Sequence, residues 1–418
     1  MRWLLTLLLL LSFPEMLLAQ EEEYSFDLSE IEIKPYHIGG YVELRPVLFG
    51  LDRDSSSHKL KFYDHGEGHT LDVYNLTFQL DASYEKGITG LYLKTNTDLK
   101  QSDVESSEET ELYEGYLSIE PSPSLTLEVG KKTLKWGKGY AWNPVAFVDR
   151  PKNPNDPELA MEGFVVFTFE YIKSFSGALK TLSISPLILP VNESINSEFG
   201  DQSQLIFGGK IYLLLNNTDI DFMILSGKHF ADRFGIDFSR NISSNIEVHG
   251  EVSYIPDLKQ SERVSYLLGL RFLTKSDITF IFEYYKNGRG LSSDEIAKYY
   301  LDIDEAYKTY LQTGDETAIE LLQDTTDPVF RSFASMSDYL YLRISQKEPF
   351  DILYLLPSIT TIYNLIDHSF SITPELIYTP VTNLELRAKI SLFSGVSGSD
   401  FGEKQNKFRL EFRGRYYF

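Results

Sequence analysis

The chain has 418 residues, no cysteine and a formal net charge of -22, from 61 acidic against 39 basic side chains. The missing thiols exclude disulfide bonds, cysteine-ligated zinc, covalent attachment of c-type haem and a lipidated N-terminal cysteine. The large negative charge argues against nucleic acid as a partner, because phosphates repel such a surface.

The composition is polar on average but rich in aromatic rings. The mean hydropathy is -0.20, too low for a bundle of membrane-spanning helices, yet 14% of the residues are Phe, Trp or Tyr. Strands that alternate lipid-facing and water-facing side chains, with aromatic residues at both interfaces, produce this combination. We find no composition break that would divide the chain into soluble domains.

Residues 1–19 have the features of a secretory signal peptide: one Arg, an apolar run and a small residue at Ala19. Leu17 is bulky for a cleavage site, so an uncleaved helical anchor is the alternative. Residues 20–35 form an acidic, weakly amphipathic segment. No later run reaches the roughly 18 apolar residues that a spanning helix needs, so the remaining chain is either a β-barrel or soluble.

The clearest strand pattern lies at residues 74–85, after a first strand that we predict from Tyr36 and a polar loop. Its two faces are Tyr74, Leu76, Phe78, Leu80, Ala82 and Tyr84 against Asn75, Thr77, Gln79, Asp81, Ser83 and Glu85. A period of two predicts a β-strand with unlike faces. A tyrosine at each end of the apolar row indicates the two interfaces of a membrane rather than a soluble sandwich.

The same pattern recurs to the end of the chain, with short turns on one side and longer loops on the other. We predict a single antiparallel up-and-down barrel of about 18 strands over residues 36–418, with 16 as the alternative count. The remaining candidate strands lie at residues 88–100, 111–120, 125–136, 165–171, 178–189, 204–215, 220–230, 233–241, 245–254, 263–274, 278–286, 337–346, 352–364, 370–378, 384–393 and 408–418.

One connection, residues 287–336, has helical periodicity. Between residues 292 and 324 the apolar positions step by three and four, and Ser292 and Glu295 are spaced as a capping box. We predict one or two helices in an external loop, either as surface decoration or as a lid.

The chain ends on a strand with no polar tail. In residues 408–418 an apolar row ending in Phe412, Gly414, Tyr416 and Phe418 alternates with a mostly charged row. This strand resembles the closing strand of bacterial outer-membrane β-barrels, in which a terminal Phe and an aromatic residue two positions earlier are characteristic. The resemblance implies an outer-membrane barrel of the porin type, with short periplasmic turns, long extracellular loops, residues 20–35 in the periplasm, and the last strand paired with the first.

Residues 137–163 join the fifth and sixth predicted strands, the connection that folds inward in general porins. Gly137 and Gly139 permit close backbone approach, several prolines stiffen the segment, and three aromatic side chains, together with Trp136 just before it, suit packing against the wall. We predict an inward-folded constriction loop; a folded cap on the outer rim is the alternative. The aromatic and basic side chains that we assign to the constriction are Lys135, Trp136, Lys138, Tyr140, Trp142 and Arg150.

The polar rows also separate by sign. Arg387, Lys389, Arg409, Arg413 and Arg415 fall on two adjacent strands at the closure, whereas Glu247, His249 and Glu251 fall on a strand across the barrel. Opposed basic and acidic walls create a transverse field that orients solutes and tunes ion selectivity. The alternative is a set of ion pairs that brace the barrel, and both can hold.

These features predict a porin for passive diffusion of small hydrophilic or charged solutes. The alternatives are a barrel that sheathes a partner such as a multihaem cytochrome, and a carrier of hydrophobic ligands. No Ser/His/acid constellation stands out, so we predict no enzyme and no cofactor. His58, Asp64, His65, Glu67 and His69 are a weak candidate metal site in the first loop.

The partners expected for such a barrel are outer-membrane lipid and lipopolysaccharide, and the barrel assembly machinery, which would engage the C-terminal strand. The assembly is predicted to be a homotrimer or a monomer.

Overall fold

The computed structural model describes residues 34–418, except 65–67, 158, 160, 257–262 and 326–333. Residues 36–418 form one unit, and the predicted signal peptide and most of the acidic segment after it lie outside the described residues. The strands are β1 (Tyr36–Leu51), β2 (Thr70–Lys86), β3 (Thr89–Ser102), β4 (Ser106–Ser122), β5 (Leu125–Lys132), β6 (Phe164–Ser174), β7 (Leu179–Val191), β8 (Gln204–Leu215), β9 (Thr218–Gly227), β10 (Phe230–Ser243), β11 (Ile246–Ile255), β12 (Arg263–Leu273), β13 (Ile278–Lys286), β14 (Asp338–Gln346), β15 (Leu355–Asn364), β16 (Phe370–Val381), β17 (Leu384–Ser394) and β18 (Asn406–Tyr417).

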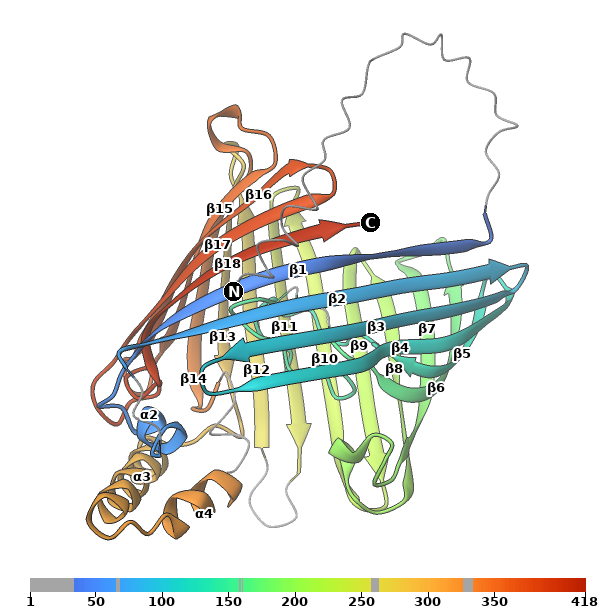
Figure 1. The fold of residues 1–418 in the computed structure, drawn as a ribbon. Coiled ribbons are helices and arrows are strands. Elements are labelled where there is room, and N and C mark those ends of the chain that lie inside the picture. Colours follow the sequence, from blue (N-terminus) through green and yellow to red (C-terminus); the bar gives the residue numbers. More distant parts are fainter. Residues whose placement is uncertain (1–33, 65–67, 158, 160, 257–262, 326–333) are drawn as a thin grey trace. The chain divides into compact units, whose positions relative to one another are not determined.

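These strands close into a single antiparallel barrel (Figure 1). Each strand pairs with its sequence neighbours, and β1 pairs with both β2 and β18. At the seam, the N–H of Gly40 donates to the carbonyl oxygen of Phe418 at 3.3 Å, and the N–H of Phe418 donates to Gly40 at 3.1 Å. The predicted 18-stranded barrel and the pairing of the last strand with the first are confirmed, and the alternative of 16 strands is wrong.

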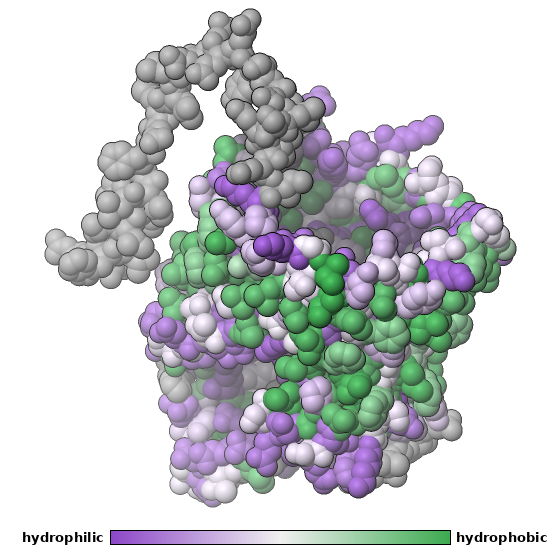
Figure 2. Space-filling view, turned by 90° about the vertical axis from the view of Figure 1, so that its right-hand side faces the viewer, coloured by the Kyte–Doolittle hydropathy of each residue, from purple (hydrophilic) through white to green (hydrophobic). Residues whose placement is uncertain are grey.

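The two faces of each strand are sorted as the alternation predicted. On β2, Tyr74 and Phe78 are 55% and 43% exposed on the outside, while Thr77 and Gln79 are only 7% and 6% exposed. Figure 2 shows hydrophobic side chains gathered over the outer surface of the strands, with hydrophilic residues toward both ends. Apolar groups outside and polar groups inside are the reverse of a soluble protein and fit a lipid-embedded wall.

Connections on one end of the barrel are tight, such as residues 87–88, 123–124, 216–217 and 382–383. Most connections on the other end are long, and they include residues 133–163 and 287–337. By the rule that periplasmic turns are short and extracellular loops long, the tight end is periplasmic.

Among the described residues, the extracellular end carries three α-helices, α2 (Ser56–Lys61), α3 (Ser293–Thr313) and α4 (Thr317–Thr325). The capping box predicted at Ser292 and Glu295 is present at the start of α3. The short α2 was not predicted, because its only N-terminal signal is one Ser55 hydroxyl that accepts from the N–H of His58 at 3.2 Å. The Lys59 ammonium joins α2 to the Asp304 carboxylate of α3 at 2.8 Å.

Several strand boundaries differ from the sequence analysis by two to five residues; β5, for example, ends at Lys132 rather than at residue 136, so the connection predicted at residues 137–163 begins at residue 133. β4 starts at Ser106 rather than residue 111, because its largely acidic first residues pair with the C-terminal half of β3. β15 starts at Leu355 rather than residue 352, because a 3-10 turn (Pro349–Asp351) with left-handed backbone at Phe350 interrupts the extended chain. A second 3-10 turn (Ser197–Phe199) follows β7. No helix among the described residues is long and apolar enough to cross a membrane.

The outward orientation of Phe78 can be tested by substitution. Phe78 lies near the middle of β2 on the outer face, where an arginine costs about 2–4 kcal/mol in a bilayer. We expect Phe78→Arg to reduce the free energy of unfolding from lipid vesicles by at least that amount, measured by denaturant titration. Ser83→Arg, on the inner row of the same strand, is the control and should change it by less than about 1 kcal/mol.

Candidate functional site: the loop inside the barrel

The described residues of the connection between β5 and β6, which are 133–157, 159 and 161–163, lie against the inner wall of the barrel. The N–H groups of Lys138 and Gly139 both donate to Glu251 Oε1 on β11 at 2.5 Å, and the N–H of Val145 donates to Glu251 Oε2 at 3.4 Å. Glu251 is 1% exposed. A buried carboxylate that accepts several backbone N–H bonds is a strong anchor, because charge-assisted hydrogen bonds are about twice as strong as neutral ones.

A second carboxylate on the same wall continues this attachment. Glu283 on β13, 0% exposed, accepts the N–H of Tyr140 at 2.5 Å and the N–H of Ala141 at 2.8 Å. The His249 Nε2 atom lies 2.9 Å from Glu283 Oε1. The predicted acidic wall is therefore occupied by the backbone of the loop.

Close backbone approach at this anchor requires glycine, as the sequence suggested. Gly137 has a φ of +97°, and a Cβ added at Gly139 would lie 2.0 Å from the carbonyl oxygen of Trp142. Any larger residue at position 139 would displace the loop from the wall.

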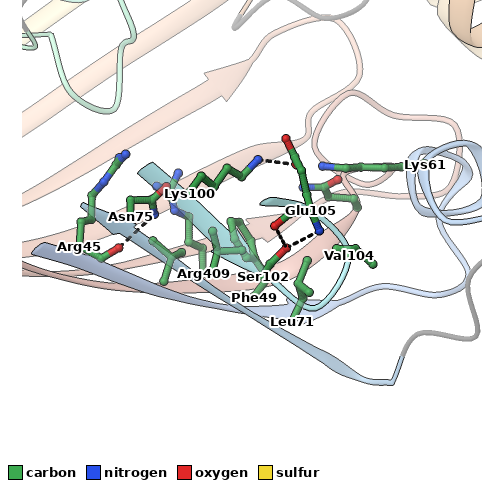
Figure 3. A pocket seen from close by; sticks show the side chains of 13 residues that line it. Arg45, Phe49, Lys61, Leu71, Asn75, Lys100, Ser102, Val104, Glu105 and Arg409 are labelled. Atoms are coloured by element: carbon green, nitrogen blue, oxygen red, sulfur yellow. Dashed lines mark hydrogen bonds and ion pairs between the residues drawn. The ribbon is translucent and has the colours of Figure 1, made fainter. Parts of the chain in front are cut away.

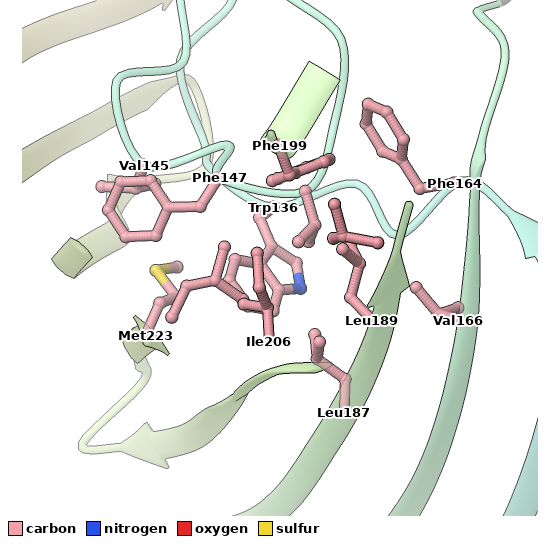
Figure 4. Close-up of a cluster of buried hydrophobic side chains, with 13 residues drawn as sticks. Trp136, Val145, Phe147, Phe164, Val166, Leu187, Leu189, Phe199, Ile206 and Met223 are labelled. Atoms are coloured by element: carbon pink, nitrogen blue, oxygen red, sulfur yellow. The ribbon is translucent and has the colours of Figure 1, made fainter. Parts of the chain in front are cut away.

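Hydrophobic packing holds the start of the loop. Trp136 and Phe147, each 3% exposed, pack edge to face at 6.4 Å and enter a buried cluster (Figure 4). The wall side chains of this cluster come from β6 to β9 and include Phe164, Val166, Leu187, Leu189, Ile206 and Met223. The inner wall is therefore not wholly hydrophilic, because this sector is apolar where the loop covers it.

Trp142 packs into a second cluster, toward the extracellular helices. Its ring stacks on Tyr285 at 5.1 Å and meets Tyr339 and Tyr341, each at 5.9 Å. Ile296 and Ile303 of α3 belong to the same cluster. Helix α3 and the loop in the barrel thus share one hydrophobic core.

Asp149 orders the backbone that leads into the lumen. Its carboxylate accepts the N–H groups of Leu134, Lys135 and Trp136 at 3.1, 3.0 and 2.6 Å. Burial raises the pKa of Asp149, against the lowering effect of these three donors. Successive N–H groups around one anion form a nest, and here the nest holds Lys135 in the left-handed region at a φ of 55°.

The far end of the loop reaches the basic wall. The Asp156 carboxylate pairs with Arg413 at 2.7 Å on β18 and with Arg387 at 3.2 Å on β17. Burial alone would raise the pKa of Asp156, but the cations of Arg413, Lys389 and Arg387 outweigh it and lower the pKa to about 2. The loop therefore crosses the lumen from the acidic wall to the basic wall.

The basic residues predicted to line the pore lie on the inner face, and nearly all of them carry partners. Lys138 pairs with Asp221 at 2.8 Å, and Arg150 pairs with Glu162 and Glu198. The cations of β17 and β18 pair as Arg387 with Glu375 and Glu385, Lys389 and Arg409 with Glu411, Arg413 with Glu43 and Glu411, and Arg415 with Glu43. Within the described part of the chain, Lys135 makes no ion pair.

The remaining predicted residues take different positions. Glu247 is partly open, with its carboxylate 3.7 Å from His249 Nδ1 and 3.9 Å from Arg271. His249 is 4% exposed and Trp142 is 6% exposed, so both pack rather than face open space.

Three cavities flank the loop. One of 410 Å³ is lined by Lys94, Glu114, Lys135 and Lys152 among others. A second of 490 Å³, lined by Asp81, Arg387 and Arg415, shares the lining residue Leu159 with the first. A third of 400 Å³ lies by His249, Arg271 and Arg343.

Sequence reasoning identified Glu251 as an inner-wall residue but missed three other carboxylates that hold the loop, those of Asp149, Asp156 and Glu283. Asp149 and Asp156 lie in the loop itself, and only its cations were considered. Glu283 had a usable signal, since it is the one acidic residue in the inner row of β13, among Thr279, Ile281 and Tyr285. No group of three His, Asp or Glu side chains among the described residues is arranged to hold a metal ion, and His65 and Glu67 of the first-loop candidate lie outside them.

The carboxylate anchor can be tested without any transport assay. The double variant Glu251→Gln with Glu283→Gln replaces each charged acceptor by a weaker, neutral one of the same shape. We expect the amides of residues 138–141 to exchange with deuterium at least about tenfold faster, since hydrogen bonds to charged groups contribute about 1.5–3 kcal/mol. Glu247→Gln, which accepts no loop amide, is the control, and equal exchange in both variants would contradict the anchor.

Solved structures with the same architecture are found by comparison of folds. Pseudomonas aeruginosa OccK5 (OpdH) matches with a TM-score of 0.51 and 12% identity over 91% of this chain and 98% of that one. Pseudomonas aeruginosa OccD3 (OpdP) matches with a TM-score of 0.51 and 8% identity over 91% of each chain. A Rhodopseudomonas blastica porin mutant aligns over 92% of this chain and 100% of that one, at 9% identity and a TM-score of 0.47.

No protein-family model matches the chain, and no curated protein matches its sequence. At these identities the structural likeness concerns the fold. It confirms the porin-like barrel that the closing strand predicted, and a barrel of this kind belongs in the outer membrane. The chain therefore has the fold of a bacterial outer-membrane porin, with 18 strands around a loop that crosses its interior.

Proposed function

We propose that the chain is an outer-membrane channel through which small hydrophilic or charged solutes diffuse passively. The observation that carries the proposal is a closed barrel with a largely polar inner face, in which charged cavities remain beside the loop. Pore width and wall charge, rather than chemistry, would then select the solutes.

The route that we favour follows the two cavities that both have Leu159 in their lining. The loop forms one side of this route through Asp149, Lys152 and Asp156. Strands β17, β18 and β1 to β4 form the other through side chains such as Arg415, Asp81 and Lys94. The loop is the constriction on this reading, because its two ends are fixed to opposite walls.

Wall charge along this route is mostly neutralised by pairing, so an unpaired group has an outsized effect on ions. Lys135 is exposed, lines the 410 Å³ cavity and is held by the Asp149 nest. We therefore assign a preference for anions to the constriction, with Lys135 as its main source.

The two alternative functions fit the interior less well. A sheath for a multihaem cytochrome needs a lumen wide enough for a protein, but here the chain's own loop crosses it between Glu251 and Arg413. A carrier of hydrophobic ligands needs an open apolar lumen, but the apolar sector of the wall is covered by Trp136 and Phe147.

The expected partners remain part of this proposal. The apolar outer rows require lipid, with lipopolysaccharide at the extracellular rim. The exposed rings of Tyr416 and Phe418, at 51% and 52%, are available to the barrel assembly machinery. A homotrimer and a monomer are the two assemblies that we propose.

Planar-bilayer recording of the purified chain tests the channel. We expect stepwise conductance that is ohmic in both polarities, because a fixed constriction conducts equally in either direction when it does not move. Purified, folded protein that gives no steps in either polarity would overturn the channel and favour a sheath or a plugged carrier.

Lys135→Glu tests the origin of selectivity. Replacing the unpaired cation by an anion should move the reversal potential in a KCl gradient toward the cation-selective side. Lys275→Glu, in the exposed periplasmic turn after β12, is the matched control and should shift it far less, because solvent screens charges beyond about 8–10 Å. Equal shifts of the reversal potential in both variants would show that Lys135 is not the source of the ion selectivity.

A further inference from the structure

A small pocket opens off the inner face near the extracellular end, away from the loop inside the barrel (Figure 3). Its volume is about 140 Å³. The lining comes from β1, β2, β3, α2, β18 and two extracellular connections.

The charged part of this lining is strongly cationic. The lining contains four cations and one carboxylate, that of Glu105; the cations are Arg45, Lys61, Lys100 and Arg409. Glu105 forms an ion pair with the Lys100 ammonium at 2.6 Å. Lys61, at the exposed rim, makes no ion pair within the described part of the chain and lies 5.4 Å from the centre of the Phe62 ring.

Acidic groups behind the lining balance the two arginines only in part. Glu411 pairs with the Arg409 guanidinium, and Glu43 Oε1 lies 3.8 Å from Arg45 Nε. The Nε atoms of Arg45 and Arg409 are both buried, and neither has a hydrogen-bond partner among the described residues. Both Nε atoms are closed off from solvent, so these side chains act on a ligand in the pocket through their positive charge rather than through these two donors.

The uncharged part of the lining has an apolar patch beside three polar side chains, those of Asn75, Ser102 and Gln405. Val47, Leu71 and Val73 are 4%, 7% and 6% exposed, and Phe49 and Val104 pack against the same cluster. The Arg409 guanidinium lies 5.6 Å from the centre of the Phe49 ring. A fully hydrated inorganic anion gains nothing from such a surface, whereas an apolar body gains about 25 cal/mol per Å² that it buries.

The size of the pocket limits that apolar body. A dry cavity of about 150 Å³ in another protein accommodates benzene, and the volume here is about 140 Å³. One ring or a short branched chain therefore fits, and a fused bicyclic body does not.

We propose that this pocket binds a small organic monoanion, with a one-ring apolar body against Val47, Leu71 and Val73 and an anionic head toward Arg45, Arg409 and Lys61. It would hold such solutes at the extracellular side before they reach the constriction, and in this respect it rests on the proposed function. The binding itself requires only that the pocket be open to water.

Isothermal titration of the purified full-length chain in detergent tests the site, with benzoate as the probe. Benzyl alcohol, which has the ring without the charge, and inorganic phosphate, which has charge without the ring, are the comparison ligands. We expect saturable binding of benzoate and at least about tenfold weaker binding of both others, because each lacks one of the two contacts. Comparable affinity for all three ligands, or no benzoate binding, would overturn the proposal.

Two variants locate the binding on the pocket. Lys61→Gln, at the exposed end of α2, removes one rim cation and should weaken benzoate binding about fivefold or more. Val104→Gln, in the connection before β4, makes the apolar wall polar and should weaken it by a similar factor. Lys275→Gln in the periplasmic turn is the matched charge control, and equal affinity of Lys61→Gln, Val104→Gln and this control would place the site elsewhere.

Conductance of the same preparations separates this inference from the channel. Steps without benzoate binding would overturn the pocket alone, and benzoate binding without steps would overturn the channel alone.

Discussion

The structure depends on one constraint: in hydrocarbon, every backbone N–H and C=O must find its partner within the protein. An 18-stranded sheet meets this only if its first and last strands pair, and the reciprocal hydrogen bonds between Gly40 and Phe418 complete that pairing at the C-terminal residue. Gly40 also has to be glycine, since a Cβ there would lie 2.0 Å from the carbonyl oxygen of Gln79. The rows of exposed outer side chains and buried inner ones follow from closure, because each strand then separates lipid from an enclosed interior.

Closure creates a second problem, which the loop of residues 133–163 solves. A barrel of this size encloses more volume than the side chains of its wall can fill. The loop fills part of it by three means: carboxylates of the wall accept its N–H groups, Asp156 pairs with the basic wall, and aromatic residues cover the apolar sector. None of these contacts would suffice alone, because an isolated segment in water loses about 1–2 kcal/mol of backbone conformational entropy for each residue that becomes ordered. Together they fix a segment that has no regular secondary structure.

The barrel could be predicted from the sequence because its signal is local and repeated. Alternation along β2 and the aromatic end of β18 fix which face meets lipid, and the tight turns set the strand count. The loop contacts could not be predicted in the same way, since Glu251 and Glu283 meet residues more than 100 positions earlier in the chain. The sequence shows that a carboxylate lies in an inner row, but it does not show whether the partner of that carboxylate is water, a cation or a set of backbone N–H groups. The sign of the walls was therefore recognisable, but the partners of Asp149 and Asp156 were not.

The partners of the charged side chains decide how strongly the walls act on a solute in the lumen. The transverse field expected from opposed acidic and basic walls assumes that both face water. In the folded chain Glu251 and Glu283 are covered by the loop backbone, and Arg413 lies among Glu43, Asp156 and Glu411. Such pairs are strongly attractive at close range but produce only a weak field at a distance, because opposite charges at about 3 Å cancel beyond their own separation. Ion selectivity is then determined by the few charges without a counter-ion. Among the predicted constriction residues, this unpaired charge is that of Lys135. The Asp149 carboxylate stabilises the unfavourable left-handed backbone of Lys135.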